Sequence, residues 1–369
     1  MKITFCLESS FNSGGMERML SVIANAVAEH EEVTVVTVFN EGRSDCFAFS
    51  SKVMRVDLGI CRSSMASAKE VKKEYRRQLE QWLVQHRQDV TVSLGSLEFF
   101  FLPWLKDGSK KVFWFHFALN YDVLTCAITP WPWANNIIGK MKRRRRIAIA
   151  RKYDRVVCLS KADLAKWRRH MPHVSQIYNP LTVSKWAEPD YGAHRVIAVG
   201  RLDRQKGFDW LISAWQKVHQ KYPDWQLDIY GEGADRRQLQ QQIDRLQLGG
   251  VVSLPGSTAE INREYARHSL MVLSSRYEGF GLVLCEAAVC GVAQVAFDCE
   301  SGPAEIIDHG KSGLLVSPVG NIDGLADALC QLMADEDKRC SMGKWAEVKA
   351  RQWALDVITG QWLDLFHGL

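Results

Sequence analysis

Two carboxylates, Glu278 and Glu286, stand eight positions apart in this sequence. The four residues that follow the first of them are Gly279, Phe280, Gly281 and Leu282. Eight helical residues turn to within about 80° of the starting direction, so both acids could line one end of a helix. A buried strand is predicted over 270–275, which places Glu278 where a strand ends and a helix begins. In open α/β sheets ligands bind at that edge, where glycines admit a close ligand and free N–H groups face its phosphates. An ordinary turn with one solvated and one salt-bridged glutamate is the alternative.

A second glycine pair, Gly14 and Gly15, lies between a predicted strand at 2–7 and a predicted helix at 15–30. Glycine at this position lets backbone N–H groups approach an anion at the start of a helix. The spacing differs from the G-x-G-x-x-G pattern of dinucleotide sites, and a simple tight turn remains the alternative.

Two cations, Arg201 and Lys206, lie between Gly200 and Gly207, directly after a strand predicted over 195–200. They would therefore stand at the same edge of the second sheet as Glu278. Arginine offers a planar fork and lysine a point charge, and the two together suit a diphosphate. As isolated surface cations they would carry no function.

His116 ends a predicted strand among the aromatic residues Trp114, Phe115 and Phe117. A lone histidine in such surroundings is either a hydrogen-bonded core residue or, at an open edge, a group that moves a proton. The only D-x-D sequence, Asp335 to Asp337, falls where a helix is predicted to begin. We therefore interpret it as a helix cap and not as a metal site.

Strand-like and helix-like stretches alternate along both halves of the chain, which predicts an α/β protein with two parallel, doubly wound sheets. The strands are predicted over 2–7, 32–39, 53–58, 89–94, 111–117, 154–160, 195–200, 227–230, 251–254, 270–275, 293–297 and 314–317. The main helices are predicted over 15–30, 66–85, 208–221, 235–246 and 344–366, with others around Lys140, Lys161 and Glu286. Periodicity is lost over 179–193, where two prolines occur, and this stretch is the predicted linker.

The composition, 47% hydrophobic and 24% charged, is that of a water-soluble globular protein of 369 residues, long enough for two domains. The ten cysteines form no C-x-x-C pair, which favours reduced thiols in the cytosol. No signal peptide or membrane-spanning run is expected. Residues 1–185 hold 29 Lys+Arg against 17 Asp+Glu, a net charge of +12, whereas residues 186–369 hold 18 against 25, a net charge of −7. The two halves are therefore expected to face different partners.

The densest basic run extends from Lys140 to Arg146 and follows Trp131 and Trp133. Aromatic rings beside a cluster of cations suit an anionic membrane surface. Nucleic acid is a weaker alternative because no recognition motif accompanies the charge, and a plain solvated helix face is a third interpretation.

Five short patterns, in this order along the chain, resemble those of the retaining glycosyltransferases of family 4, which have the two-domain GT-B fold. They are Gly14-Gly-x-Glu-Arg18, Gly200-Arg-Leu-x-x-Gln-Lys-Gly207, Gly231-Glu-Gly233, the Glu278–Glu286 pair and Gly302-Pro-x-Glu-Ile-Ile307. The resemblance spans nearly the whole chain. It implies two Rossmann-like domains that face a central cleft. Residues 1–183 would bind the acceptor and face the membrane, 184–345 would bind the nucleotide sugar, and a helix over 346–369 would return to the first domain.

The resemblance also implies roles for individual residues at a UDP-sugar site. Arg201 and Lys206 would hold the diphosphate, and Glu286 the ribose hydroxyls. Glu278, with the backbone from Phe280 to Leu282, would contact the sugar and phosphates. The remaining residues that the resemblance places at the site are Gly14 and Gly15 at the phosphate, Gly279 and Gly281 in the donor loop, and His116 as the active-site histidine.

We therefore expect an enzyme that transfers a hexose (galactose, glucose or an N-acetylhexosamine) with retention from a UDP-sugar to a lipid-linked or lipopolysaccharide-type acceptor. The resemblance is greatest to hexosyltransferases of bacterial lipopolysaccharide, O-antigen and capsule synthesis. No metal and no other cofactor is expected. The expected location is the cytoplasm, on the inner face of the membrane, with contact through Lys140–Arg146. A GT-B nucleotide-sugar epimerase and a non-catalytic sugar-nucleotide or membrane-binding module are the alternatives.

Overall fold

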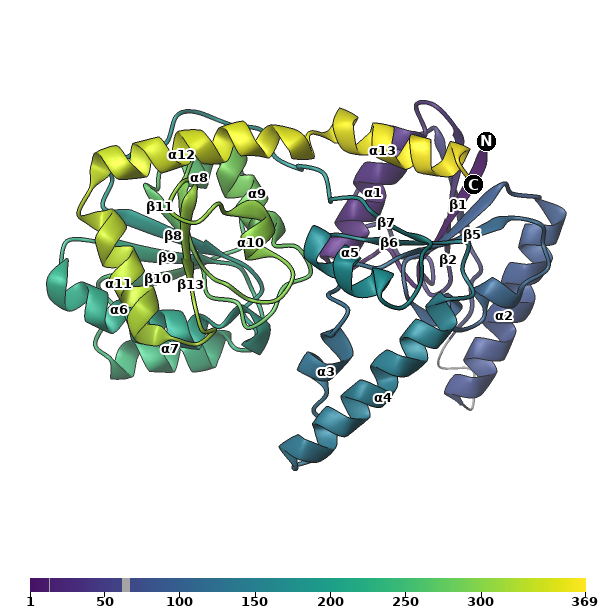
Figure 1. Cartoon of the computed structure of the whole chain (residues 1–369), viewed down its shortest axis with the longest axis horizontal. Coiled ribbons are helices and arrows are strands. Elements are labelled where there is room, and N and C mark those ends of the chain that lie inside the picture. Colours follow the sequence, from purple (N-terminus) through teal and green to yellow (C-terminus); the bar gives the residue numbers. More distant parts are fainter. Residues whose placement is uncertain (13, 62–66) are drawn as a thin grey trace. The chain divides into compact units, whose positions relative to one another are not determined.

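The chain folds into two structural units. A computed structural model describes residues 1–12, 14–61 and 67–369. Unit 1 comprises Met1–Pro180 and Leu355–Leu369, and unit 2 comprises Leu181–Ala354. The chain thus passes into unit 2 three residues before the expected position, and the returning segment begins at Leu355 instead of residue 346 (Figure 1).

Unit 1 is built on a seven-stranded parallel sheet in the order β3-β2-β1-β4-β5-β6-β7. Its strands are β1 Lys2–Cys6, β2 Glu32–Thr37, β3 Val53–Asp57, β4 Val90–Ser93, β5 Lys110–Trp114, β6 Arg155–Cys158 and β7 Val174–Gln176. Strand order reverses between β1 and β4, so the crevice beyond their carboxyl ends is the switch point of this sheet. The short edge strand β7 was not predicted, because three residues carry too little periodicity.

Helices cover both faces of this sheet. They are α1 Gly15–Val27, α2 Ala68–Gln85, α3 Tyr121–Thr125, α4 Pro132–Ala150, α5 Lys161–Arg168 and α13 Leu355–His367, with short 3-10 turns at Leu97–Phe100 and Leu102–Trp104. The helix predicted over 66–85 begins at Ala68 because the Ser67 hydroxyl accepts the Glu70 N–H; residue 66 lies outside the described part of the chain. Side chains alternate along the strands, so Phe5 meets Phe366 of α13 while its neighbour Cys6 joins the core beneath α2.

Unit 2 is built on a six-stranded parallel sheet in the order β10-β9-β8-β11-β12-β13. Its strands are β8 Arg195–Val199, β9 Gln226–Tyr230, β10 Val252–Gly256, β11 Leu270–Leu273, β12 Ala293–Phe297 and β13 Gly313–Val316. Its helices are α6 Phe208–Lys221, α7 Arg236–Arg245, α8 Ile261–Ala266, α9 Leu282–Val289, α10 Pro303–Ile306, α11 Ile322–Met333 and α12 Glu336–Ala350, with 3-10 turns at Arg204–Lys206 and Arg351–Trp353. Two parallel α/β sheets confirm the predicted fold class.

The single helix predicted over 344–366 is wrong. The chain forms α12, breaks over 351–354 and then forms α13. Ala354 has an extended backbone (φ −58°, ψ 144°), and this is the residue where the chain leaves unit 2. The hydrophobic pattern continues across the break because Trp353 and Trp362 are both fully buried, each in a different unit.

The D-x-D sequence is a helix cap, as predicted. The Asp335 carboxylate accepts the Lys338 N–H at 2.9 Å at the start of α12. Asp337 lies in the first turn, where a negative charge complements the helix dipole.

Candidate active site

The carboxyl edge of the unit 2 sheet brings Lys206 and Glu278 together from positions 72 residues apart. Lys206 ends the turn after β8, and Glu278 follows β11, the neighbouring strand. The Lys206 ammonium lies 2.7 Å from a Glu278 carboxylate oxygen, and the Ser275 hydroxyl donates to the same oxygen at 2.6 Å. Glu278 is only 7% exposed, so the ion pair is largely shielded from water.

Local backbone structure explains how Lys206 reaches this position. The Asp203 carboxylate accepts the Lys206 N–H, and Gly207 follows in the left-handed region at φ 65°. A side-chain carbon on Gly207 would lie 2.1 Å from the Ser274 carbonyl oxygen, so only glycine fits. The Ser274 hydroxyl in turn donates to the Lys206 carbonyl at 2.9 Å. The turn after β8 is therefore held directly against the segment that carries Glu278.

Arg201 follows the same strand but lies in the open. Its side chain is 71% exposed, and its guanidinium pairs with Asp203 at 3.4 Å. The structure therefore places both predicted cations at one sheet edge but joins only Lys206 to Glu278.

The donor loop, defined as residues 278–282, connects β11 to α9. Gly281 adopts φ 95°, a left-handed conformation at the N-cap of α9, and Leu282 is the first helical residue. Gly302 packs against this loop, since a side-chain carbon there would lie 2.7 Å from the Phe280 carbonyl oxygen. The N–H groups at the start of α9 therefore lie next to Glu278.

Because α9 begins four residues after Glu278, the eight-residue step between the two acids is not wholly helical. The two carboxylates accordingly have different partners. Glu286, 4% exposed, accepts the Thr182 hydroxyl at 3.0 Å on one oxygen, and the Tyr265 hydroxyl lies 3.4 Å from the other. Glu286 lies within α9, whereas Glu278 lies before this helix begins. The prediction that both acids line one end of a helix is therefore wrong for Glu278.

In unit 1, Gly14 is the N-cap of α1 and Gly15 is its first residue. His116 lies just beyond β5 and is 8% exposed, with its ring 4.3 Å from that of Trp114. Burial lowers the pKa of His116 to about 3, so the imidazole is neutral at physiological pH. Within the described part of the chain its Nε2 atom has no hydrogen-bond partner. His116 is thus buried, as in the core interpretation, and its Nε2 atom is shielded from solvent.

Sequence reasoning missed Glu98, a fully buried carboxyl group beyond β4 at the switch point of unit 1. It accepts the Ser93 hydroxyl at 2.8 Å and the Ser96 N–H at 3.1 Å. Burial raises the pKa of Glu98 to about 7, despite these hydrogen bonds. The adjacent Leu97 N–H donates to Glu8, two residues after β1. Only the fold reveals this pair, because neither acid belongs to a recognisable pattern.

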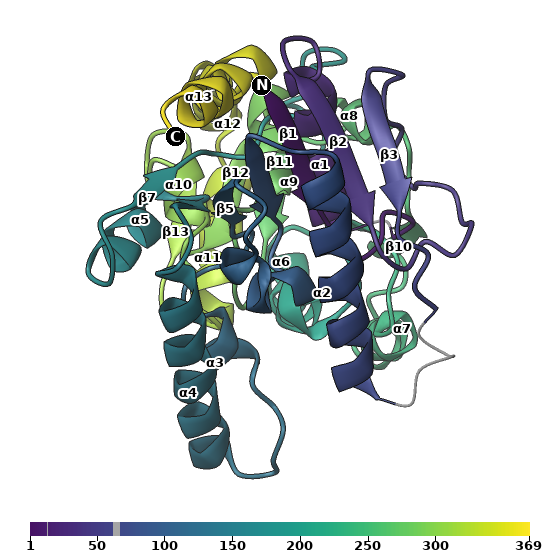
Figure 2. The same cartoon turned by 90° about the vertical axis from the view of Figure 1, so that its right-hand side faces the viewer.

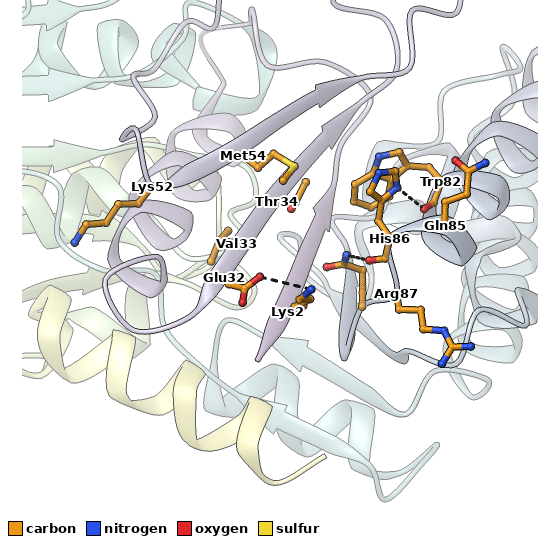
Figure 3. Close-up of a pocket in the computed structure, with 11 residues that line it drawn as sticks. Lys2, Glu32, Val33, Thr34, Lys52, Met54, Trp82, Gln85, His86 and Arg87 are labelled. Atoms are coloured by element: carbon orange, nitrogen blue, oxygen red, sulfur yellow. Dashed lines mark hydrogen bonds and ion pairs between the residues drawn. The ribbon is translucent and has the colours of Figure 1, made fainter.

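A hollow lies elsewhere in unit 1, at the amino ends of the strands (Figure 3). It has a volume of about 560 Å³, and the stacked rings of Trp82 and His86 face Thr34 and Met54 across it. The predicted site residues that follow strands lie at the carboxyl ends of those strands, the opposite edge from this hollow. This hollow is therefore not part of the candidate site.

The basic run is less free than its sequence suggested. Figure 2 shows the short helix α3 lying alongside α4. The Arg146 guanidinium makes two hydrogen bonds of 2.8 and 2.7 Å to Asp122, and Arg143 donates to Asn120. These two arginines hold α3 against α4, whereas Lys140, Lys142, Arg144 and Arg145 are exposed. The prediction that the whole run faces a partner is therefore wrong for Arg143 and Arg146.

Among residues 1–12, 14–61 and 67–369, no group of three acidic, histidine or cysteine side chains is placed to hold a metal ion. Over the same residues no helix is both long and apolar enough to cross a bilayer.

Comparisons with known proteins agree with the two-unit α/β fold. Residues 187–349 match the family described as "Glycosyl transferases group 1". An uncharacterized glycosyltransferase of Haemophilus influenzae is 24% identical over 98% of both chains. An exopolysaccharide phosphotransferase of Streptomyces coelicolor is 41% identical over 47% of this chain, which spans only 18% of that protein. The solved structure of a point mutant of TarM from S. aureus, in complex with fondaparinux, alpha-GlcNAc-glycerol and UDP, superposes over 99% of both chains with a TM-score of 0.80 at 16% identity.

The chain has the GT-B fold, and unit 2 holds the group 1 domain. Residues 187–349 thus match the group 1 glycosyltransferases, and the likeness to TarM extends the fold, at low sequence identity, over nearly the whole chain.

Proposed function

We propose that this protein transfers a hexose, with retention, from a UDP-sugar to a lipid-linked or lipopolysaccharide-type acceptor in bacterial surface polysaccharide synthesis. The hexose would be galactose, glucose or an N-acetylhexosamine. The observation that carries the proposal is the shielded Lys206–Glu278 pair beside the N-terminus of α9. The fold neighbour TarM has UDP in its complex, and the Streptomyces relative is named for an exopolysaccharide, which supports the donor and the acceptor class.

In the proposed site, Lys206 and Arg201 take the diphosphate. Lys206 already stands at the sheet edge, and Arg201 would turn from its exposed pair with Asp203 toward a phosphate. The N–H groups of the donor loop add hydrogen bonds to the same anion. Within unit 1, Gly14 and Gly15 at the start of α1 form a separate phosphate-binding turn. Because two cations supply the positive charge, we propose that no metal is required.

Transfer would proceed on one face of the sugar. The acceptor oxygen bonds to the anomeric carbon as the bond from that carbon to the diphosphate breaks, and the acceptor's proton passes to the leaving diphosphate oxygen. Lys206 and Arg201 stabilise the charge that develops on this leaving group. Glu278 accepts hydrogen bonds from the sugar. In unit 1, neutral His116 can donate or accept a hydrogen bond without carrying a charge.

Nucleotide titration calorimetry separates the roles of the two acids. Glu286→Ala is expected to weaken UDP about 10-fold or more, since a hydrogen bond to a charged group is worth roughly 1.5–3 kcal/mol. Glu278→Gln is expected to bind UDP within about threefold of wild type yet lose release of UDP from a UDP-sugar. Glu188→Gln, an exposed surface acid, serves as the control. Unchanged UDP affinity in Glu286→Ala would contradict the ribose assignment.

The same proposal includes an anionic membrane surface as partner, at the cytoplasmic leaflet. Trp133, Ile137 and Met141 recur every four residues on α4, and each is more than half exposed. Trp131 and Ile128 add exposed apolar surface just before this helix. With the four exposed cations of the run, α4 presents an apolar stripe and positive charge, as interfacial helices do.

Replacing Lys140, Lys142, Arg144 and Arg145 with Gln is expected to release the protein from phosphatidylserine vesicles. Each cation near an anionic surface contributes about 1 kcal/mol, so sedimentation should show a loss of about 100- to 1000-fold in affinity. UDP affinity should not change, because the nucleotide site lies in unit 2. The matched control removes four exposed cations from α2, namely Lys69, Lys73, Arg76 and Arg77. Equal losses in both variants would indicate a non-specific charge effect and refute the α4 surface.

A further inference from the structure

Two residues of the segment from Glu278 to Glu286 contact residues near the first and last positions of unit 2. Thr182 is the second residue of that unit and donates its hydroxyl to Glu286 at 3.0 Å. Trp353 is the second-last residue, and its ring meets Phe280 of the donor loop edge-on, with centroids 6.1 Å apart. The Leu181 N–H donates to the Trp353 carbonyl at 2.8 Å, so the incoming and outgoing segments are tied together.

The carboxylate of Glu286 is held from two sides. Thr182 donates to one oxygen, while the Tyr265 hydroxyl of α8 lies 3.4 Å from the other and 3.2 Å from the Val283 carbonyl. One contact on each oxygen restricts rotation of the carboxylate plane. Thr182 suits this role because a β-branched side chain has few rotamers. An acid already fixed in orientation loses less entropy when a ligand binds.

We propose that Thr182 is a positioning residue of the nucleotide site, whose hydroxyl orients Glu286 toward the hydroxyls of the ribose. The inference rests on the proposed function, which assigns Glu286 to the ribose. Thr182 lies 104 residues before Glu286, in a segment that the sequence indicated only as a linker. The nucleotide site therefore extends beyond the group 1 match, which begins at residue 187.

The experiment measures UDP affinity by calorimetry on the full chain with two substitutions at this position. Thr182→Val keeps the shape and removes the donor, so UDP should bind about 10-fold more weakly. Thr182→Ser restores a hydroxyl and should recover affinity to within about threefold of wild type. In steady-state assays with a UDP-sugar, Thr182→Val should raise KM for the donor more than it lowers kcat.

Deoxy nucleotides distinguish positioning from a merely structural role. If Thr182 acts through the ribose, the ratio of wild-type to Thr182→Val affinity should fall toward one with 2′-deoxy-UDP or 3′-deoxy-UDP. A structural defect would weaken UDP and both deoxy nucleotides equally, and that result would overturn the inference. Tyr265→Phe removes the second hydroxyl and should show the same dependence on the ribose, which keeps the test decisive if Thr182→Val does not fold.

Two failures are distinguishable. Wild-type protein that does not bind UDP would overturn the proposed function together with this inference. Wild type and Thr182→Val that bind UDP equally well would overturn the role of Thr182 alone and leave the proposed function standing.

Discussion

Replacing Lys206 with Met is expected to lower turnover of a UDP-sugar about 10- to 100-fold, since a charge-assisted hydrogen bond contributes roughly 1.5–3 kcal/mol. The Lys206 ammonium lies 2.7 Å from a Glu278 carboxylate oxygen, and both side chains are largely shielded from water. Its charge would stabilise the leaving diphosphate more in the transition state than in the bound substrate. UDP release from UDP-glucose, UDP-galactose and UDP-N-acetylglucosamine, measured without acceptor, reports the effect.

Lys217→Met provides the matched control, because Lys217 forms an exposed surface pair with Asp323 on α11. This variant should retain wild-type turnover. Arg201→Ala is expected to reduce turnover over the same range as Lys206→Met. Near-normal turnover in the Lys206→Met, Arg201→Ala double variant would remove the diphosphate assignment.

Replacing Asp228 with Asn is expected to destabilise unit 2 by about 3 kcal/mol, the scale for breaking a buried ion pair. Asp228 is buried on β9 and accepts from Arg195 at 2.6 Å and from Ser253 at 2.6 Å. The fully buried His268 ring places Nε2 2.9 Å from Asp228 and Nδ1 2.6 Å from the Glu264 carbonyl. Both ring nitrogens thus face acceptors, and the Asn variant would leave this cluster without its anion.

The dependence on pH follows from the direction of the Asp228 pKa. Burial opposes ionisation, but hydrogen bonds from His268, Ser253 and Arg195 outweigh it and hold the pKa of Asp228 well below its usual range. A carboxyl group with a lowered folded-state pKa stabilises the fold above its unfolded pKa of about 3.9 and loses that contribution as pH falls further. The stability difference between wild type and Asp228→Asn should therefore be full at pH 7 and shrink below about pH 4.

Urea unfolding followed by tryptophan fluorescence at several pH values measures this difference. Asp327→Asn, which removes an exposed carboxylate near Lys221, controls for a general effect of lost charge. A stability difference that stays constant from pH 7 to pH 3 would show that Asp228 contributes through packing and not through its charge.

The order of strands and helices could be predicted from the sequence because short apolar runs and amphipathic stretches are local signals. The placement of Lys206 and Glu278 at one edge also followed from local pattern. The carboxyl ends of neighbouring parallel strands share an edge, so each residue had only to be placed after its own strand. The glycines at strand-to-helix turns could also be predicted, because each follows its own predicted strand.

Tertiary structure alone decided which side chains meet. No local pattern indicates that Thr182 reaches Glu286, that Asp228 accepts from His268, or that Glu98 is sealed from water. Within one basic run, Arg143 and Arg146 turn toward α3 while their neighbours remain exposed. The sequence by itself determined the two α/β sheets and the residues available at their edges, because these depend on interactions within short segments. The partners and burial of those residues depend on contacts between segments distant in the chain, which only the packed fold specifies.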